Sequence, residues 1–171
     1  MARLDISKVQ TAVHEKLDYS EYDSTIVQNE VNCYCHAIGS TAIHKGIRIG
    51  ELSCLKPINE KYISEDEVER LFIEDMKSIR LTCRKLKKSN KADIINWLGT
   101  HEFKNTESII MLFVQKNADK SIRDFHFWRY DSEKGFTEKR FWNRLTYIDT
   151  PQYSWPEGEM CTFVGAYLLK R

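Results

Sequence analysis

The second half of the chain contains a series of short hydrophobic runs, and this series restricts the fold more than any other feature. The runs are rich in β-branched and aromatic residues, and turn-forming residues separate them, as is typical of antiparallel strands. We predict strands over residues 94–98, 108–114, 125–130, 136–142 and 162–168. The turn between the third and fourth runs ends at Gly135, a residue suited to the positive φ of a hairpin.

The first half of the chain has helical spacing instead. Apolar residues recur at helical intervals over residues 6–17, and again over 65–88, where Ser64 and Glu67 form a capping box at the start. The segment 18–31 is polar, and we predict a loop there. Helices followed by strands define an α+β fold, here with N-terminal helices packed on a C-terminal antiparallel sheet.

Length and composition fit one domain over residues 1–171. A chain of this length with 42% hydrophobic residues can bury a single core. The 26 basic and 25 acidic residues leave a net charge of +1, so no overall field attracts nucleic acid or an anionic membrane surface. No apolar run approaches the roughly 18 residues that span a bilayer. We therefore expect neither nucleic acid nor a membrane as a partner.

The cysteines indicate a reducing compartment. Their number, five, is odd, and they form no dense disulfide framework. The N-terminus also lacks the apolar core of a signal peptide. We expect a cytoplasmic protein, or an effector that is translocated without a conventional signal peptide.

Cys33 stands at the expected start of a helix, directly after the polar segment. Unsatisfied backbone N–H groups and the positive end of the helix dipole stabilise an anion there, which lowers a thiol pKa from about 8.5 toward neutrality. We predict that Cys33 is a nucleophile and the most reactive thiol. The other cysteines, by contrast, suit the role of small buried hydrophobic residues.

A cysteine nucleophile needs a base, and His126 is the histidine embedded in a strand-like segment. If the following hairpin is centred near Ser132, strand alternation puts Glu138 directly opposite His126. A carboxylate in that position would orient the imidazole as the third member of a Cys-His-Glu triad. Asn143 and Asp149 are the alternatives for this third position.

Gln28 lies five residues before Cys33, and its side-chain amide can donate to an oxyanion together with the backbone N–H of Cys33. Cys33, Cys35 and His36 also suggest a metal site at first sight. Their spacing is too tight for a usual zinc knuckle, and no second Cys/His pair follows at a suitable distance. We expect no metal and no cofactor.

Several motifs together resemble a family of little-characterised bacterial and phage papain-like proteins. Members have Asn-Cys-Tyr-x-Tyr-Ala, then a His-Phe/Trp-Tyr-Arg-Gln strand, a glycine and Trp-Ser-His-Lys. This chain matches over residues 32–37 (Asn-Cys-Tyr-Cys-His-Ala), over 126–129 (His-Phe-Trp-Arg) and at Gly135, with further similarity over 49–53 and 163–167. The resemblance implies a papain-like fold and catalytic roles for the matching cysteine and histidine.

The chain departs from the family pattern at two positions. His36 replaces the second tyrosine of the first motif, and residues 136–139 read Phe-Thr-Glu-Lys instead of Trp-Ser-His-Lys. Glu138 therefore occupies the place of the family's second histidine. A carboxylate can accept from an imidazole, but its reach and charge differ from those of a histidine.

We therefore expect a papain-like cysteine hydrolase that acts by acyl transfer on an amide bond of a protein or peptide. Cys33 would attack the carbonyl, His126 would move the proton and Glu138 would orient the ring. Peptidase, amidase and protein-modifying effector or toxin activities all fit this chemistry. The alternative is a non-catalytic binding or inhibitor module on the same fold. The sequence does not define an oligomeric state.

Overall fold

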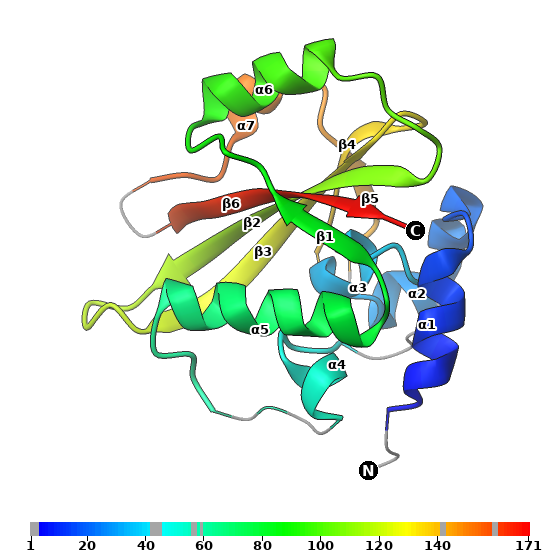
Figure 1. The fold of residues 1–171 in the computed structure, drawn as a ribbon, viewed down its shortest axis with the longest axis horizontal. Helices are drawn as coiled ribbons and strands as arrows, with labels where there is room; N and C mark the ends of the chain where they lie inside the picture. The colour runs from blue at the N-terminus through cyan, green and yellow to red at the C-terminus, as the bar shows by residue number, and fades with distance from the viewer. Residues whose placement is uncertain (1–3, 42–45, 56–57, 59, 141–142, 159–160) are drawn as a thin grey trace.

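The fold of the protein was obtained as a computed structural model, which describes residues 4–41, 46–55, 58, 60–140, 143–158 and 161–171 (Figure 1). Its centre is one six-stranded sheet with the order β1-β6-β2-β3-β4-β5, in which every neighbouring pair is antiparallel. The strands are β1 (Thr82–Lys85), β2 (Glu107–Lys116), β3 (Ile122–Asp131), β4 (Gly135–Lys139), β5 (Leu145–Tyr147) and β6 (Cys161–Lys170).

Helices cover both faces of this sheet (Figure 1). In chain order they are α1 (Ile6–His14), a 3₁₀ turn (Tyr19–Asp23), α2 (Thr25–Glu30), α3 (Cys33–Ala37), α4 (Glu51–Cys54), α5 (Glu65–Ser78), α6 (Lys91–Thr100) and α7 (Pro151–Ser154). The helices α1 to α5 lie on one side, and α6 and α7 lie on the other. The α+β class and the antiparallel sheet are thus confirmed, although not all helices precede the strands.

The central strand β2 shows why the sheet needs both helical layers. Ile110, Leu112 and Val114 belong to the core on the α5 side. The alternate residues Ile109, Met111 and Phe113 belong to the core on the α6 side. Successive side chains of a strand point to opposite faces, so a strand covered on both faces is a continuous hydrophobic run.

The strand predicted over 94–98 is wrong, because these residues lie within α6. The side chain of Asn90 accepts from the backbone N–H of Asp93 and caps the helix. Ile94 and Leu98 are its buried residues, four positions apart as on one helical face. A short apolar run does not by itself distinguish the two structures.

The helix predicted over 65–88 starts with the expected Ser64 cap but is too long. It ends at Ser78, Arg80 has a φ of +61°, and the chain then forms β1, which pairs with β6. Residues 82–85, which we predicted as helix, form this edge strand.

The predictions for the segments 18–31 and 136–142 also need correction. The segment 18–31 is not a plain loop, because it forms the 3₁₀ turn and α2. The helix that begins at Cys33 ends at Ala37, and Gly39 continues the chain with a φ of +78°. The predicted strand 136–142 is β4 up to Lys139, and residues 141–142 lie outside the described part of the chain. Within the described residues, no helix is long and apolar enough to cross a membrane.

Asp75 is a fully buried carboxylate on the inner face of α5. It accepts from the Tyr34 hydroxyl at 2.6 Å, from the Gly50 backbone N–H at 2.6 Å and from the Ser53 backbone N–H at 2.8 Å. Burial raises the pKa of Asp75, and these donors act against that rise. Asp75 thereby joins α5 to α3 and to the start of α4.

Candidate active site

Asn32 fixes the start of α3 and therefore the position of Cys33. Its side-chain oxygen accepts from the backbone N–H of Cys35 at 3.0 Å, as an N-cap residue does. Its side-chain nitrogen donates to the carbonyl of Ile47 at 2.7 Å. The cap is thus held by the segment that follows the helix, and Cys33 is the first helical residue.

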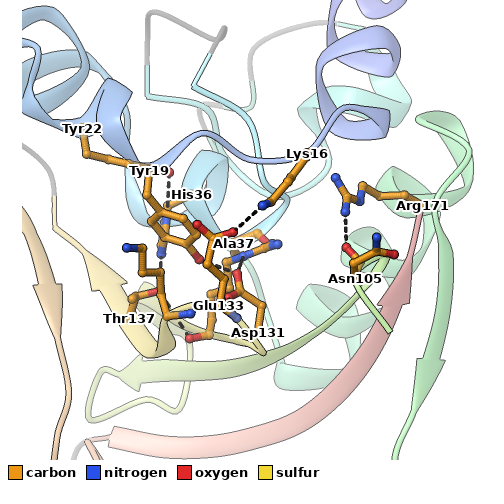
Figure 2. Close-up of polar contacts among 12 residues, drawn as sticks. Lys16, Tyr19, Tyr22, His36, Ala37, Asn105, Asp131, Glu133, Thr137 and Arg171 are labelled. Atoms are coloured by element: carbon orange, nitrogen blue, oxygen red, sulfur yellow. Dashed lines mark hydrogen bonds and ion pairs between the residues drawn. The ribbon is translucent and has the colours of Figure 1, made fainter. Parts of the chain in front are cut away.

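The other end of α3 is held by Arg129 on β3. Its guanidinium donates to the Ala37 carbonyl at 2.8 Å, and its Nε lies 3.3 Å from a carboxylate oxygen of Asp131. Asp131 also accepts from the Tyr19 hydroxyl, and Figure 2 shows both residues close to Ala37. A cation at a helix C-terminus is favourable. The short helix is therefore held at its start by the segment around Ile47 and at its end by the sheet.

His36 is buried between two hydroxyl groups (Figure 2). Its Nδ1 lies 2.6 Å from the Tyr22 hydroxyl and its Nε2 lies 2.9 Å from the Thr137 hydroxyl. Burial lowers the pKa of His36 well below its ordinary value, so the ring is neutral. Both ring nitrogens are occupied, and His36 acts as a structural residue of α3. Among the described residues, no group of three His, Cys, Asp or Glu side chains could hold a metal ion.

Cys33 and His126 line the same cavity, which has a volume of about 460 Å³. The Cys33 thiol donates to the carbonyl of Phe125, the residue before His126, with an Sγ to oxygen distance of 3.9 Å. Within the described part of the chain, no hydrogen bond joins Sγ to the His126 ring. Cys33 belongs to the core on the α5 side of the sheet, whereas His126 pairs with Phe113, which belongs to the core on the α6 side. The two predicted residues therefore line one cavity from opposite faces of β3 and are not paired directly.

The pKa of the Cys33 thiol is shifted in the direction opposite to our prediction. The residue is only 8% exposed, and its burial, together with the negative charge of Asp124, raises the pKa of the thiol to about 12. Backbone N–H groups act in the opposite direction but do not outweigh burial. The helix α3 has only five residues, so its dipole is short. The prediction of a lowered thiol pKa is wrong, and the resting thiol is neutral.

We therefore expect iodoacetamide at neutral pH to alkylate Cys33 at least about a hundredfold more slowly than the exposed Cys54, because only the thiolate reacts. The Cys33 rate should continue to rise through the alkaline range. Peptide mapping of timed samples measures both rates, and labelling in denaturant, where the two thiols should react similarly, is the control. Faster labelling of Cys33 than of Cys54 in the folded protein at pH 7 would contradict the neutral resting thiol.

His126 and Glu138 form the second part of the site. The His126 Nε2 lies 2.6 Å from a carboxylate oxygen of Glu138, and the Trp128 indole donates to the same oxygen at 3.1 Å. The Nε of Arg140 lies 3.6 Å from the other oxygen. Burial on its own would raise the pKa of Glu138, but the hydrogen bond and charge of His126, with Arg140 and Trp128, hold it below its usual value. Glu138 is therefore an anion at neutral pH.

The predicted register of this hairpin is wrong, although the predicted contact is present. Glu138 pairs with Trp128 across the strands, and the hairpin is centred one residue later than Ser132. A hairpin centre that moves by one residue moves each pair by two, which keeps every side chain on its face. Glu138 therefore reaches His126 diagonally instead of from directly opposite.

Gln28, predicted as an oxyanion donor, lies elsewhere. Its side-chain amide donates to the carbonyls of Tyr22 at 3.2 Å and Asp23 at 3.3 Å. Its backbone carbonyl accepts from Lys139, a lysine at the end of β4 whose pKa burial lowers to about 8. Gln28 is not among the described residues that line the Cys33 cavity. The side-chain amide of Gln28 therefore stabilises the segment around α2, and the geometry does not support its predicted role as an oxyanion donor.

The two alternatives to Glu138 do not contact His126. The backbone N–H of Asn143 donates to the carbonyl of Arg140. Asn143 lines neither the Cys33 cavity nor the neighbouring cavity, which shares Arg140 and Pro156 with it. Asp149 lines the neighbouring cavity, together with Glu138. Of the three candidates, Glu138 is the residue that the structure joins to the imidazole.

Several cavity residues were not predicted from the sequence. Besides Cys33 and His126, the lining includes the charged residues Arg48, Asp124 and Arg140 and the exposed Gln115. Arg140 could have been found, because it follows Glu138 by two positions and strand alternation puts both on one face. Arg48 comes from a segment with no regular pattern, and nothing in its sequence context points to the cavity.

Comparison with models of known protein families, with curated proteins and with solved structures found no match to this chain. The assignment of the fold therefore rests on the structure alone, which is α+β with a six-stranded antiparallel sheet.

Proposed function

We propose that the protein is a papain-like cysteine hydrolase that transfers the acyl group of a protein or peptide amide. The observation that supports this most is the single cavity lined by Cys33, at the start of α3, and by His126, which is hydrogen-bonded to Glu138. A nucleophile, a base and an orienting carboxylate are the three groups that such chemistry needs.

In the proposed reaction, the Cys33 sulfur attacks the carbonyl carbon of the substrate. The contact of His126 Nε2 with the Glu138 carboxylate leaves Nδ1 as the proton acceptor. His126 takes the thiol proton and gives it to the leaving amine when the C–N bond breaks, which leaves a thioester on Cys33. Water then cleaves the thioester, with His126 again moving the proton. Because the resting thiol is neutral, proton transfer accompanies the attack instead of preceding it.

We propose two donors for the oxyanion of this reaction. The backbone N–H of Cys33 lies in the first turn of α3, where such groups have no partner within the helix. Gln115 lines the same cavity with an exposed side-chain amide, and it replaces Gln28 as the proposed side-chain donor. Together they would stabilise the charge that develops on the carbonyl oxygen.

Replacement of Glu138 by glutamine tests the orienting role. We expect kcat to fall about 10²-fold, because the amide keeps an acceptor but loses the charge that stabilises the imidazolium. Glu102→Gln is the matched control, since it removes the charge of an exposed carboxylate that lines neither cavity. A normal kcat in the Glu138 variant would contradict the orienting role.

A non-catalytic binding module is the second candidate function. It is favoured by the buried, neutral Cys33 thiol and by the lack of a described hydrogen bond between that thiol and His126. Peptidyl aryl esters, followed by peptide mapping, separate the two functions. Acylation of Cys33 that requires His126 supports the hydrolase, whereas no acylation of Cys33 at any pH supports the binding module.

A further inference from the structure

A second cavity, of about 340 Å³, adjoins the Cys33 cavity. The two share Arg140 and Pro156 as walls. The hydrogen-bonded pair of His126 and Glu138 lies at the boundary between the two cavities, because His126 lines the first and Glu138 lines the second. A substrate with its scissile bond at Cys33 would therefore extend past this pair into the second cavity.

Two carboxylates line the second cavity, and they differ in their partners. Glu138 accepts from His126 and Trp128 and faces Arg140. Asp149 lies in the turn between β5 and α7, and it makes no hydrogen bond or ion pair with any residue that the structure describes. The negative charge of Asp149 is thus free to meet a ligand.

The remaining walls suit a long cationic side chain. Aromatic surfaces pack against an aliphatic stem and attract a cation, while hydroxyl groups accept hydrogen bonds from an ammonium or guanidinium group. The second cavity offers both kinds of group, from Trp128, Tyr147, Thr146, Thr150 and Ser154.

We propose that this second cavity is the subsite for a lysine or arginine side chain of the substrate, with Asp149 as its specificity-determining residue. The proposal rests on the proposed function, because it assigns the substrate class of the same site. An acidic side chain fits less well. Arg140 is the cation among the described lining residues, and it already faces Glu138.

Binding to the Cys33→Ala protein tests this subsite without catalysis. The probes are short acetylated peptide amides that differ only in one central residue: lysine, norleucine or glutamate. We expect calorimetry to give about three- to fivefold tighter binding of the lysine peptide than of the norleucine peptide, as for a partly exposed ion pair. Asp149→Asn should remove this preference, and Asp149→Lys should favour the glutamate peptide. Glu102→Gln makes the same change in charge at an exposed residue outside the cavity, and it should preserve the preference.

Equal binding of the three peptides, binding of none of them, or a lysine preference that survives Asp149→Asn would overturn the subsite. Peptidyl electrophiles on the wild-type protein test the hydrolase separately. Labelling of Cys33 with no side-chain preference would support the hydrolase and remove the subsite. A lysine preference in binding with no labelling of Cys33 would support the subsite and remove the hydrolase.

Discussion

Replacement of Cys33 by alanine is expected to lower acyl-transfer turnover by about 10⁴- to 10⁶-fold in a protein that remains folded. The loss is large because no other described group of the cavity can form the covalent intermediate, apart from the partly buried Cys161. Removal of one buried sulfur should lower the free energy of unfolding by only about 1 kcal/mol. Turnover of a peptidyl aryl ester and thermal unfolding measure the two effects independently.

Cys35→Ala and Cys161→Ala are the matched controls. Cys35 is fully buried in the same helix but does not line the cavity, so its variant should lose stability without losing the chemistry. Cys161 lines the cavity from β6, and its variant should retain turnover. If Cys33→Ala retains turnover while Cys161→Ala abolishes it, the nucleophile lies on β6 and the motif around Cys33 is structural.

The sheet could be predicted from the sequence where strands are buried or end in a clear turn. The run that became β2 is continuously apolar, and Gly135 marks the hairpin with a φ of +67°. The edge strand β1 (Thr82–Lys85) was missed, because it is short and polar and gains its partner only from β6. The prediction of a strand over 94–98 was wrong for a different reason. Its apolar residues fit a strand as well as a helix, and a cap at Asn90 decided between them.

Part of the candidate site, like part of the sheet, could be predicted from local sequence patterns. The contact of His126 with Glu138 could be predicted, since alternation along two strands limits which side chains can meet. The role of Cys33 as a nucleophile stays a prediction. The thiol pKa depends instead on burial beneath distant segments and on Asp124, which no local pattern reveals. The predicted oxyanion role of Gln28 is not supported, because its side-chain amide donates to two backbone carbonyls. Contacts of that kind are set by tertiary structure.

Asp75→Ala is expected to have the largest effect on stability, with the free energy of unfolding falling by about 3–5 kcal/mol. The change removes the acceptor of two buried donors, the Tyr34 hydroxyl and the backbone N–H of Gly50, and of the partly buried backbone N–H of Ser53. Asp75→Asn keeps one acceptor oxygen and should lose less. Urea unfolding monitored by circular dichroism gives these differences.

Glu74→Ala is the control for Asp75, because Glu74 is the adjacent residue of α5 and its one ion pair with a described residue is the exposed pair with Arg70. Its effect should stay within about 0.5 kcal/mol. Tyr34 directly follows Cys33, so loss of the Asp75 contact should also loosen the start of α3 and speed alkylation of the Cys33 thiol. If Asp75→Ala unfolds at the same urea concentration as Glu74→Ala, the buried carboxylate does not hold α3 to α5. Unchanged alkylation of Cys33 in a destabilised Asp75 variant would instead show that the Asn32 cap and Arg129 suffice to position the helix.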